Sequence, residues 1–158
     1  MIKKAEIFLL FSLALFICSS GFAQSAKRQA AVKEAKGIVE LKIGSDAWSA
    51  AKVGTLLNQG DSIRSKANSW AVIEILDLEG KERTASVELK PNSQLRLQEI
   101  LENKEKQSQT TMLDLSLGEI LIKAEKLDSE KSKFEVKTPT SVVGVRGTQF
   151  SVTVEAIE

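Results

Sequence analysis

Histidine is absent from this sequence of 158 residues, and cysteine occurs once, as Cys18. One cysteine cannot form an intramolecular disulfide, so the fold must rest on its hydrophobic core. Because histidine is missing and the cysteine stands near the start of the chain, the common zinc and copper sites are excluded. Nucleophilic triads that use histidine as the base are excluded as well. We therefore expect a protein without metal or cofactor.

An excess of one charge is also lacking. The chain carries 22 basic and 21 acidic residues, which gives a formal net charge of +1. Without Lys3, Lys4 and Glu6, which lie in the first few residues, 20 of each sign remain. Nucleic-acid binding usually needs a basic surface, because lysine and arginine neutralise the phosphates. The neutral balance argues against a nucleic-acid partner.

The sequence contains one long apolar run, Ile7–Cys18. Its 12 residues are few for a membrane-spanning helix, which needs roughly 20. Two lysines precede the run and small residues follow it, an order typical of a secretory signal peptide. The sequence therefore predicts a signal peptide over 1–23, with cleavage before Gln24. We expect export to the periplasm or cell envelope, and no transmembrane helix in the mature chain.

Cys18 leaves an alternative open. In a bacterial lipoprotein signal, a cysteine after a short apolar run carries the lipid, and the residue just before it is normally small. Here that residue is Ile17. Lipidation of Cys18 is therefore the weaker interpretation, and a lipid anchor stays an alternative to plain cleavage.

Helical patterns are missing too, since no stretch carries an apolar stripe of period 3.6 over three turns. From Gly37 onward apolar and polar residues alternate over short runs, as in Val39-Leu41-Ile43 and Phe150-Val152-Val154. Such alternation is typical of half-buried strands. We expect one all-β domain over 37–158, with about ten short strands, β-solenoid-like or sandwich-like. The residues 24–36 are expected to be a polar tail or a short helix.

Turn signals separate the expected strands, among them Ala67-Asn68-Ser69 and Pro91-Asn92-Ser93. Two runs rich in lysine and glutamate, 102–110 and 125–133, are expected to be solvated loops. The segments GIVELK and GEILIK, which both begin with glycine, show a weak sequence similarity. It could mark an internal repeat, as in a β-solenoid of stacked coils.

The segment TPTSVVGVRGTQF, Thr138–Phe150, departs from plain strand sequence. Pro139 cannot donate to a sheet ladder and belongs at a strand boundary. Gly144 and Gly147 permit a positive φ or a close approach of backbone. A phosphate-binding loop would carry a lysine next to a hydroxyl and would precede a helix, whereas a strand pattern follows here. The segment therefore predicts a bend at Pro139, a turn through the glycines and a new strand from Thr148.

Arg146 lies within this predicted turn. We expect a structural arginine there, held by a carboxylate or by backbone carbonyls, because a guanidinium offers five donors in a fixed fork and can tie several loops together. Asp61, in the turn that it forms with Gly60, is the expected carboxylate partner. The alternative is that Arg146 docks a partner protein.

The same segment resembles the signature of FecR-type domains, in which a Thr-Pro pair precedes the motif V-R-G-T-x-F. Upstream stretches such as Gly60–Ser65 and Leu117–Ile120 also fit, so the resemblance covers Gly37–Val154. The signature residues, for which we expect a structural role, are Thr138, Pro139, Gly144, Val145, Arg146, Gly147, Thr148 and Phe150.

The resemblance also implies a function. Members of this family include periplasmic parts of iron-uptake sensors, in which a transmembrane helix joins the domain to a cytoplasmic segment that controls a sigma factor. This sequence has a predicted leader in place of that arrangement and looks more like the free-standing exported FecR-type proteins. We therefore expect a non-catalytic envelope protein, a protein-interaction or signalling-accessory module with another envelope protein as its partner.

Two alternatives come from other functional classes. The first is an envelope scaffold or cell-wall protein associated with glycan. Trp48 and Trp70 are a candidate sugar platform, although packing against the sheet is the favoured interpretation of both. The second is a glycan-cleaving enzyme, in which Asp61 and Glu40 would act as acid and base. The residues around these carboxylates are those of ordinary turns and surfaces. We therefore expect no enzyme and no catalytic residues.

Overall fold

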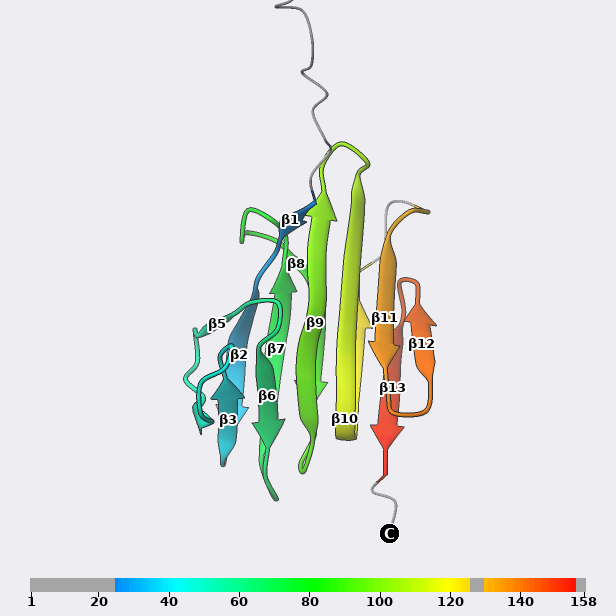
Figure 1. Ribbon diagram of the computed structural model, residues 1–158. Helices are drawn as coiled ribbons and strands as arrows, with labels where there is room; N and C mark the ends of the chain where they lie inside the picture. Colours follow the sequence, from blue (N-terminus) through cyan, green and yellow to red (C-terminus); the bar gives the residue numbers. More distant parts are fainter. Residues whose placement is uncertain (1–24, 126–129, 156–158) are drawn as a thin grey trace, which may run out of the picture.

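The computed structural model describes residues 25–125 and 130–155. These residues form thirteen β-strands and no helix (Figure 1). The strands are β1 (Ala26–Lys27), β2 (Ala30–Lys36), β3 (Val39–Lys42), β4 (Ser49–Ala50), β5 (Leu56–Leu57), β6 (Ser62–Ser65), β7 (Trp70–Leu76), β8 (Arg83–Leu89), β9 (Gln94–Asn103), β10 (Ser108–Ala124), β11 (Lys133–Lys137), β12 (Val142–Val145) and β13 (Gln149–Val154). The prediction of a single all-β domain is confirmed. The predicted signal peptide, with Cys18, lies outside the described residues.

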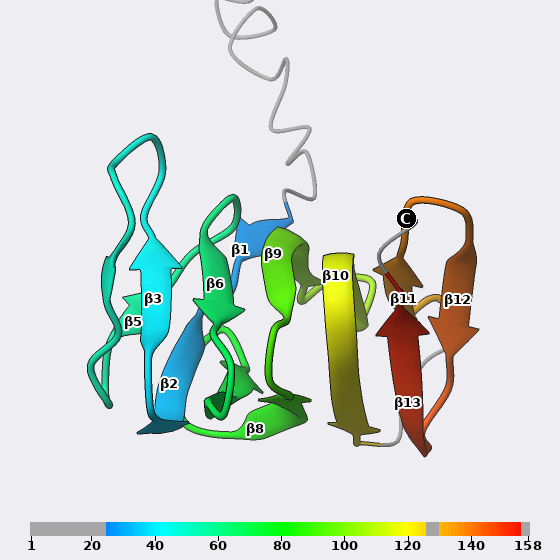
Figure 2. The same ribbon diagram turned by 90° about the horizontal axis from the view of Figure 1, so that it is seen from below.

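The strands belong to one sheet that folds over on itself into two layers (Figures 1 and 2). Layer A has the order β4-β3-β6-β9-β10-β11-β12, and layer B has the order β5-β2-β7-β8-β10-β13. β10 belongs to both layers, because its first part pairs with β9 and β11 and its second part pairs with β8 and β13. Neighbouring strands are antiparallel except for β10 and β11. The sandwich-like alternative therefore describes the fold, since the coils of a β-solenoid stack parallel strands.

The hydrophobic core lies between the layers, and the alternation of each strand decides which side chains enter it. In β7, Ala71, Ile73 and Ile75 are buried while the residues between them are partly exposed. In β10 the buried positions change from odd to even numbers at Gly118: Leu113 and Leu115 are buried before it, Ile120 and Ile122 after it. The two alternating runs of the sequence are thus one strand that changes layer at its glycine.

Four of the corners at which the chain passes from one layer to the other stack along one side of the sandwich. They lie at Gly37 between β2 and β3, at 66–69 between β6 and β7, at 90–93 between β8 and β9, and at Gly118 within β10. Backbone hydrogen bonds join successive corners: Lys66 N–H donates to Ile38 O (3.0 Å), Asn92 N–H to Lys66 O (3.2 Å) and Lys90 N–H to Glu119 O (3.0 Å). The corners therefore continue the hydrogen-bond ladder from one layer into the other.

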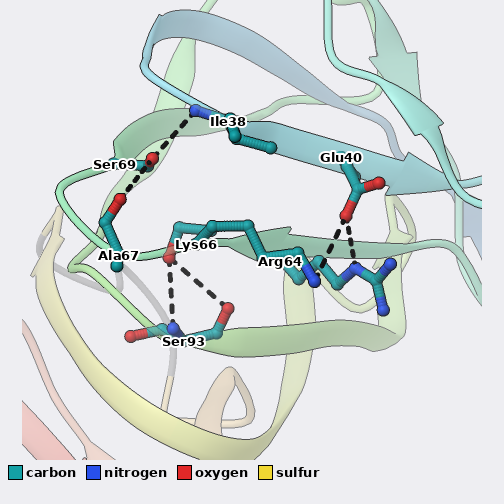
Figure 3. A network of polar contacts seen from close by, with 8 residues as sticks. Ile38, Glu40, Arg64, Lys66, Ala67, Ser69 and Ser93 are labelled. Carbon is teal, nitrogen blue, oxygen red and sulfur yellow. Dashed lines mark hydrogen bonds and ion pairs between the residues drawn. The ribbon is translucent and has the colours of Figure 1, made fainter.

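The two predicted turns share the pattern Lys-x-Asn-Ser and have the same conformation. Asn68 and Asn92 both have a φ of 54°, in the left-handed region that asparagine tolerates. The serine of each turn binds the corner next to it. Ser69 Oγ accepts a hydrogen bond from Ile38 N–H (2.8 Å, Figure 3), and Ser93 Oγ accepts one from Glu119 N–H (2.9 Å). The weak similarity between GIVELK and GEILIK thus marks two equivalent corners, at Gly37 and Gly118.

The N-terminal segment corrects one expectation. The residues 24–36 were expected to be a tail or a short helix, but β1 pairs with β9, and β2 lies between β5 and β7 in layer B. Ala30 and Val32 of β2 are fully buried. The pattern of this segment is hidden by alanines and by an irregularity between Val32 and Glu34, which breaks the alternation.

Other differences concern short or polar strands. About ten strands were expected and thirteen are present, because β1, β4 and β5 have two residues each and show no alternation. The run 102–110 was expected to be a loop, but β9 extends to Asn103 and β10 begins at Ser108, so a tight turn joins them. Of the second run, the residues 126–129 lie outside the described part of the chain, and β11 begins at Lys133.

Candidate interaction site

The signature segment forms the last hairpin of layer A and the link from there to layer B. Thr138 closes the turn between β11 and β12: its N–H donates to Ser141 O (2.8 Å), and its Oγ1 accepts from Ser141 N–H (3.0 Å). Pro139 is exposed in that turn, where its missing N–H costs no ladder hydrogen bond. The predicted strand boundary at Pro139 is therefore present.

The predicted turn through both glycines is wrong. Val142–Val145 form strand β12, which pairs along its whole length with β11. Gly144 lies inside this strand without a positive φ, and a Cβ added to it would meet nothing within 4 Å. Only Gly147 has the expected left-handed conformation, with a φ of 66°, in the short link to β13. Three valines favour a strand strongly enough that one glycine at an edge does not end it.

Arg146 is exposed, and within the described residues it forms no hydrogen bond or ion pair. The expected partner has other bonds. Asp61 is buried, and its carboxylate accepts hydrogen bonds from the N–H groups of Gly44 (2.8 Å) and Asn58 (2.7 Å). Asp61 thus holds two turns of the N-terminal half, and the proposed pairing of Asp61 with Arg146 is wrong.

The buried arginine of this fold is Arg28, 1% exposed, which the sequence did not single out. Its guanidinium donates to Thr84 Oγ1 (2.8 Å) in layer B and to Thr111 Oγ1 (2.5 Å) in layer A, as well as to the carbonyl oxygens of Leu101 and Thr110 (3.2 Å each). Burial lowers the pKa of Arg28 to about 10, against the opposing charges of Glu102 and Asp77. Arg28 therefore stays protonated at neutral pH and ties the two layers together.

Glu40 and Trp48 have partners on the outer face of layer A. Glu40 forms ion pairs with Arg64 (2.7 Å) and Lys66 (3.7 Å), and the hydrogen bond from Arg64 lowers the pKa of Glu40 (Figure 3). The Arg64 guanidinium also stacks on the Trp48 ring, 4.1 Å from its centroid. Trp70 lies in β7 of layer B. The structure thus does not join the two tryptophans into one platform, and it gives Glu40 and Asp61 different partners.

Both layers end in free strand edges next to the signature. In the described part of the chain, β12 pairs with β11 alone and β13 pairs with β10 alone. Val142 is 61% exposed and Val143 36% exposed, and β12 carries no charged residue. We call β12 and β13 together the open end of the sandwich. An edge of this kind, without charges or proline, is ready to pair with a further strand.

The opposite end of the sandwich differs. Its outermost strands, β4 and β5, have two residues each. Very short edge strands are one of the means by which proteins prevent unwanted strand pairing. The open end is therefore the better candidate for an interaction site.

The described residues contain no group of three or more histidine, cysteine, aspartate or glutamate residues that could hold a metal ion. They also contain no helix of the length and apolarity needed to cross a membrane.

Comparison with known protein families matches residues 61–157 to the family described as FecR protein. This is more than half of the chain. The chain belongs to the FecR family. No curated protein and no solved structure matches it in the same comparisons. The FecR family is related to signalling and is associated with the cell envelope.

The FecR match begins at Asp61, just before β6, and contains the whole signature segment. It leaves out β1 to β5, although β2 and β3 supply buried residues to the core. In this FecR chain the signature residues build the open end, and the residues before the match complete the sandwich.

Proposed function

We propose that this FecR-family chain is a non-catalytic protein-interaction module, an accessory of signalling that acts outside the cytoplasmic membrane. The observation that carries this proposal is the position of the signature segment. Residues 138–150 form a turn that is exposed except for Thr138, an uncharged edge strand and an exposed link, and of their apolar side chains only Val145 and Phe150 pack against the core. A motif that builds an open sheet edge is better suited to pairing with a protein than to catalysis.

The second candidate, a glycan-associated scaffold, has less support. A sugar platform needs an aromatic face that is free to stack on the sugar ring. One face of Trp48 is covered by the Arg64 guanidinium, and Trp70 stands in the other layer. No observation favours glycan over protein as the ligand.

The interaction can be tested in cells with a photocrosslinking amino acid at Val142. Val53, 64% exposed at the opposite end, is the matched control, since its exposure is close to the 61% of Val142. We expect discrete cross-linked products of higher mass from Val142 and none from Val53. Equal products from both positions, or none from Val142, would argue against an interaction module that works through the open end.

The location can be tested by intact-mass measurement of the native protein. If the leader is a signal peptide, the mature chain should begin near Gln24. A diacylated chain that begins at Cys18 would support the lipid anchor instead. Retention of the residues 1–23 would contradict export by this route.

A further inference from the structure

The two layers end at different places at the open end. β11 and β13 both lie next to β10, one in each layer, so they face each other across the core. β12 adds a further strand to layer A, and no described strand pairs with the outer edge of β13 in layer B. Figures 1 and 2 show β12 farther out than β13 in both views. Layer A is therefore one strand wider than layer B at this end.

The inner face of the extra strand is apolar. Val143 pairs with Val136, and Val145 pairs with Phe134, and both partners are buried in the core. Residues directly opposite each other in an antiparallel pair point to the same face of the sheet. Val143 and Val145 thus point inward, yet Val143 is 36% exposed and Val145 is only partly buried. The layer beneath β12 is too narrow to cover them.

The backbone of β13 has groups free to pair on that side. Ala124 N–H donates to Thr148 O, so residues 124 and 148 are a hydrogen-bonded pair of the β10–β13 ladder. In an antiparallel ladder such pairs alternate with pairs that are not hydrogen-bonded. Phe150 and Val152 therefore bond to β10, while the N–H and C=O groups of Ser151 and Thr153 point to the outer edge.

We infer that the outer edge of β13 accepts one extended segment of a partner protein, which becomes a further strand of layer B beneath β12. This inference rests on the proposed function and specifies its mode. Main-chain hydrogen bonds to Ser151 and Thr153 would hold the segment, and alternating side chains would select it. The chemistry expected of the segment is four to six residues, roughly the length of β13, with apolar side chains at every second position facing Val143 and Val145.

A second copy of this chain fits the open end less well. If two copies paired through β13, each would bring its wider layer A, and β12 of one copy would overlap β11 of the other. If two copies paired through β12, layer A would continue across the dimer, but layer B would lack two strands between the β13 edges. A single strand donated by a partner would make layer B as wide as layer A. It would cause neither the overlap in layer A nor the gap in layer B.

The test supplies such a strand within one chain. The full chain receives, after Glu158, a Gly-Ser linker and a strand of alternating Val and Thr that matches the 6 residues of β13. Hydrogen exchange is then measured at the Ser151 and Thr153 amides. We expect exchange at both to slow by at least about tenfold, because edge amides become paired. A tail with Ser in place of Val should slow neither.

Ser151→Pro is the variant that should prevent the added strand from pairing with β13. It removes an N–H that points to the edge and leaves the ladder to β10 intact, so the valine tail should no longer slow exchange at Thr153. Ser151→Ala, which keeps the N–H, should respond like the parent chain. If Ser151→Pro does not fold, Thr153→Pro serves as the block with Ser151 as the reporter.

Three results would overturn the inference: no slowing with the valine tail, equal slowing with the serine tail, or amides already protected without a tail. Because the strand is supplied in the same chain, the result is independent of the natural partner. If Val142 gives cross-links but the valine tail does not slow exchange at Ser151 and Thr153, pairing at the β13 edge is rejected and the proposed function stands. Slowed exchange without cross-links would support the β13 edge and contradict the proposed function.

Discussion

At the scale of single residues, the structural role that the sequence suggested for Arg146 is filled by Arg28. Arg28 is buried and donates four hydrogen bonds to neutral oxygens of both layers. Arg146, the arginine of the signature, is exposed. A buried guanidinium bound to neutral oxygens satisfies several groups at once, and its removal leaves each of them without a partner.

We therefore expect Arg28→Ala to lower the free energy of unfolding by about 2–4 kcal/mol, from unsatisfied oxygens and the cavity left behind. Arg146→Ala is the matched control and should stay within about 0.5 kcal/mol of the parent, as exposed substitutions usually do. Denaturant melts measure both. A large loss with Arg146→Ala would restore the structural role that the sequence suggested for it.

Glu40 gives a prediction about pH. The hydrogen bond from Arg64 lowers the pKa of Glu40 in the folded state, so the folded protein binds that proton less readily than the unfolded chain. The contribution to stability is present above the unfolded pKa and is lost as pH falls through the folded one. Glu40→Gln should thus be less stable than the parent at pH 7. The difference should shrink as pH falls through the folded pKa of Glu40 and vanish in stronger acid, and denaturant melts at pH 7 and across the acid range check this. A difference that persists in acid would show that ionisation of Glu40 is not its source.

At the scale of elements, the corners explain why some glycines are required. A Cβ on Gly118 would lie 2.5 Å from Ser93 Cα and 2.6 Å from Asn92 O, and its φ is +86°. Gly37 repeats this arrangement against Ser69, with a φ of +78°. At both glycines the conformation and the neighbouring serine exclude a side chain, and at Gly118 the backbone of Asn92 and Ser93 does so as well.

Gly118→Ala should therefore cost at least about 2 kcal/mol, since left-handed strain and a clash with backbone add. Gly144→Ala, in an open edge strand, should change the midpoint of denaturation little or raise it slightly, because alanine restricts the unfolded chain. Thermal melts of the two variants make the comparison. Equal destabilisation would indicate that the outer face of β12 is already in contact with something.

At the scale of the whole molecule, the FecR match and the folded unit have different limits. The match covers 61–157, whereas the sandwich begins at β1. β2 lies between β5 and β7 and covers the core with Ala30 and Val32, and β3 adds Val39 and Leu41. The segment before the match is therefore part of the hydrophobic core.

We expect the isolated segment 61–157 to remain unfolded, because it would expose the core faces of β6 and β7 and lose Arg28. The chain from Gln24 onward is the control and should fold. Circular dichroism and the dispersion of amide proton signals distinguish the two. A cooperative thermal transition of the short segment would show that β1 to β5 are an addition to an independent fold.

The fold class could be predicted from the sequence to a large extent. Alternation of apolar residues in runs such as 71–75 and 150–154 is a local property, and a strand with one buried face must show it. The turns at 67–69 and 91–93 were equally visible, because asparagine tolerates a positive φ. What was missed lies where the local signal is weak: β1, β4 and β5 are too short to alternate, and β12 contains a glycine.

Of the candidate site, the sequence determined its location along the chain, and the tertiary structure decided its form. The residues Thr138–Phe150 carry a signature that can be read without coordinates. Whether they make a turn or an edge strand depended on β11, which supplies the ladder for β12. Which arginine is buried, and which layer ends one strand early, depend on contacts between residues far apart in the sequence. Such contacts leave no periodic pattern, because they come from the packing of whole strands and not from the order of neighbouring residues.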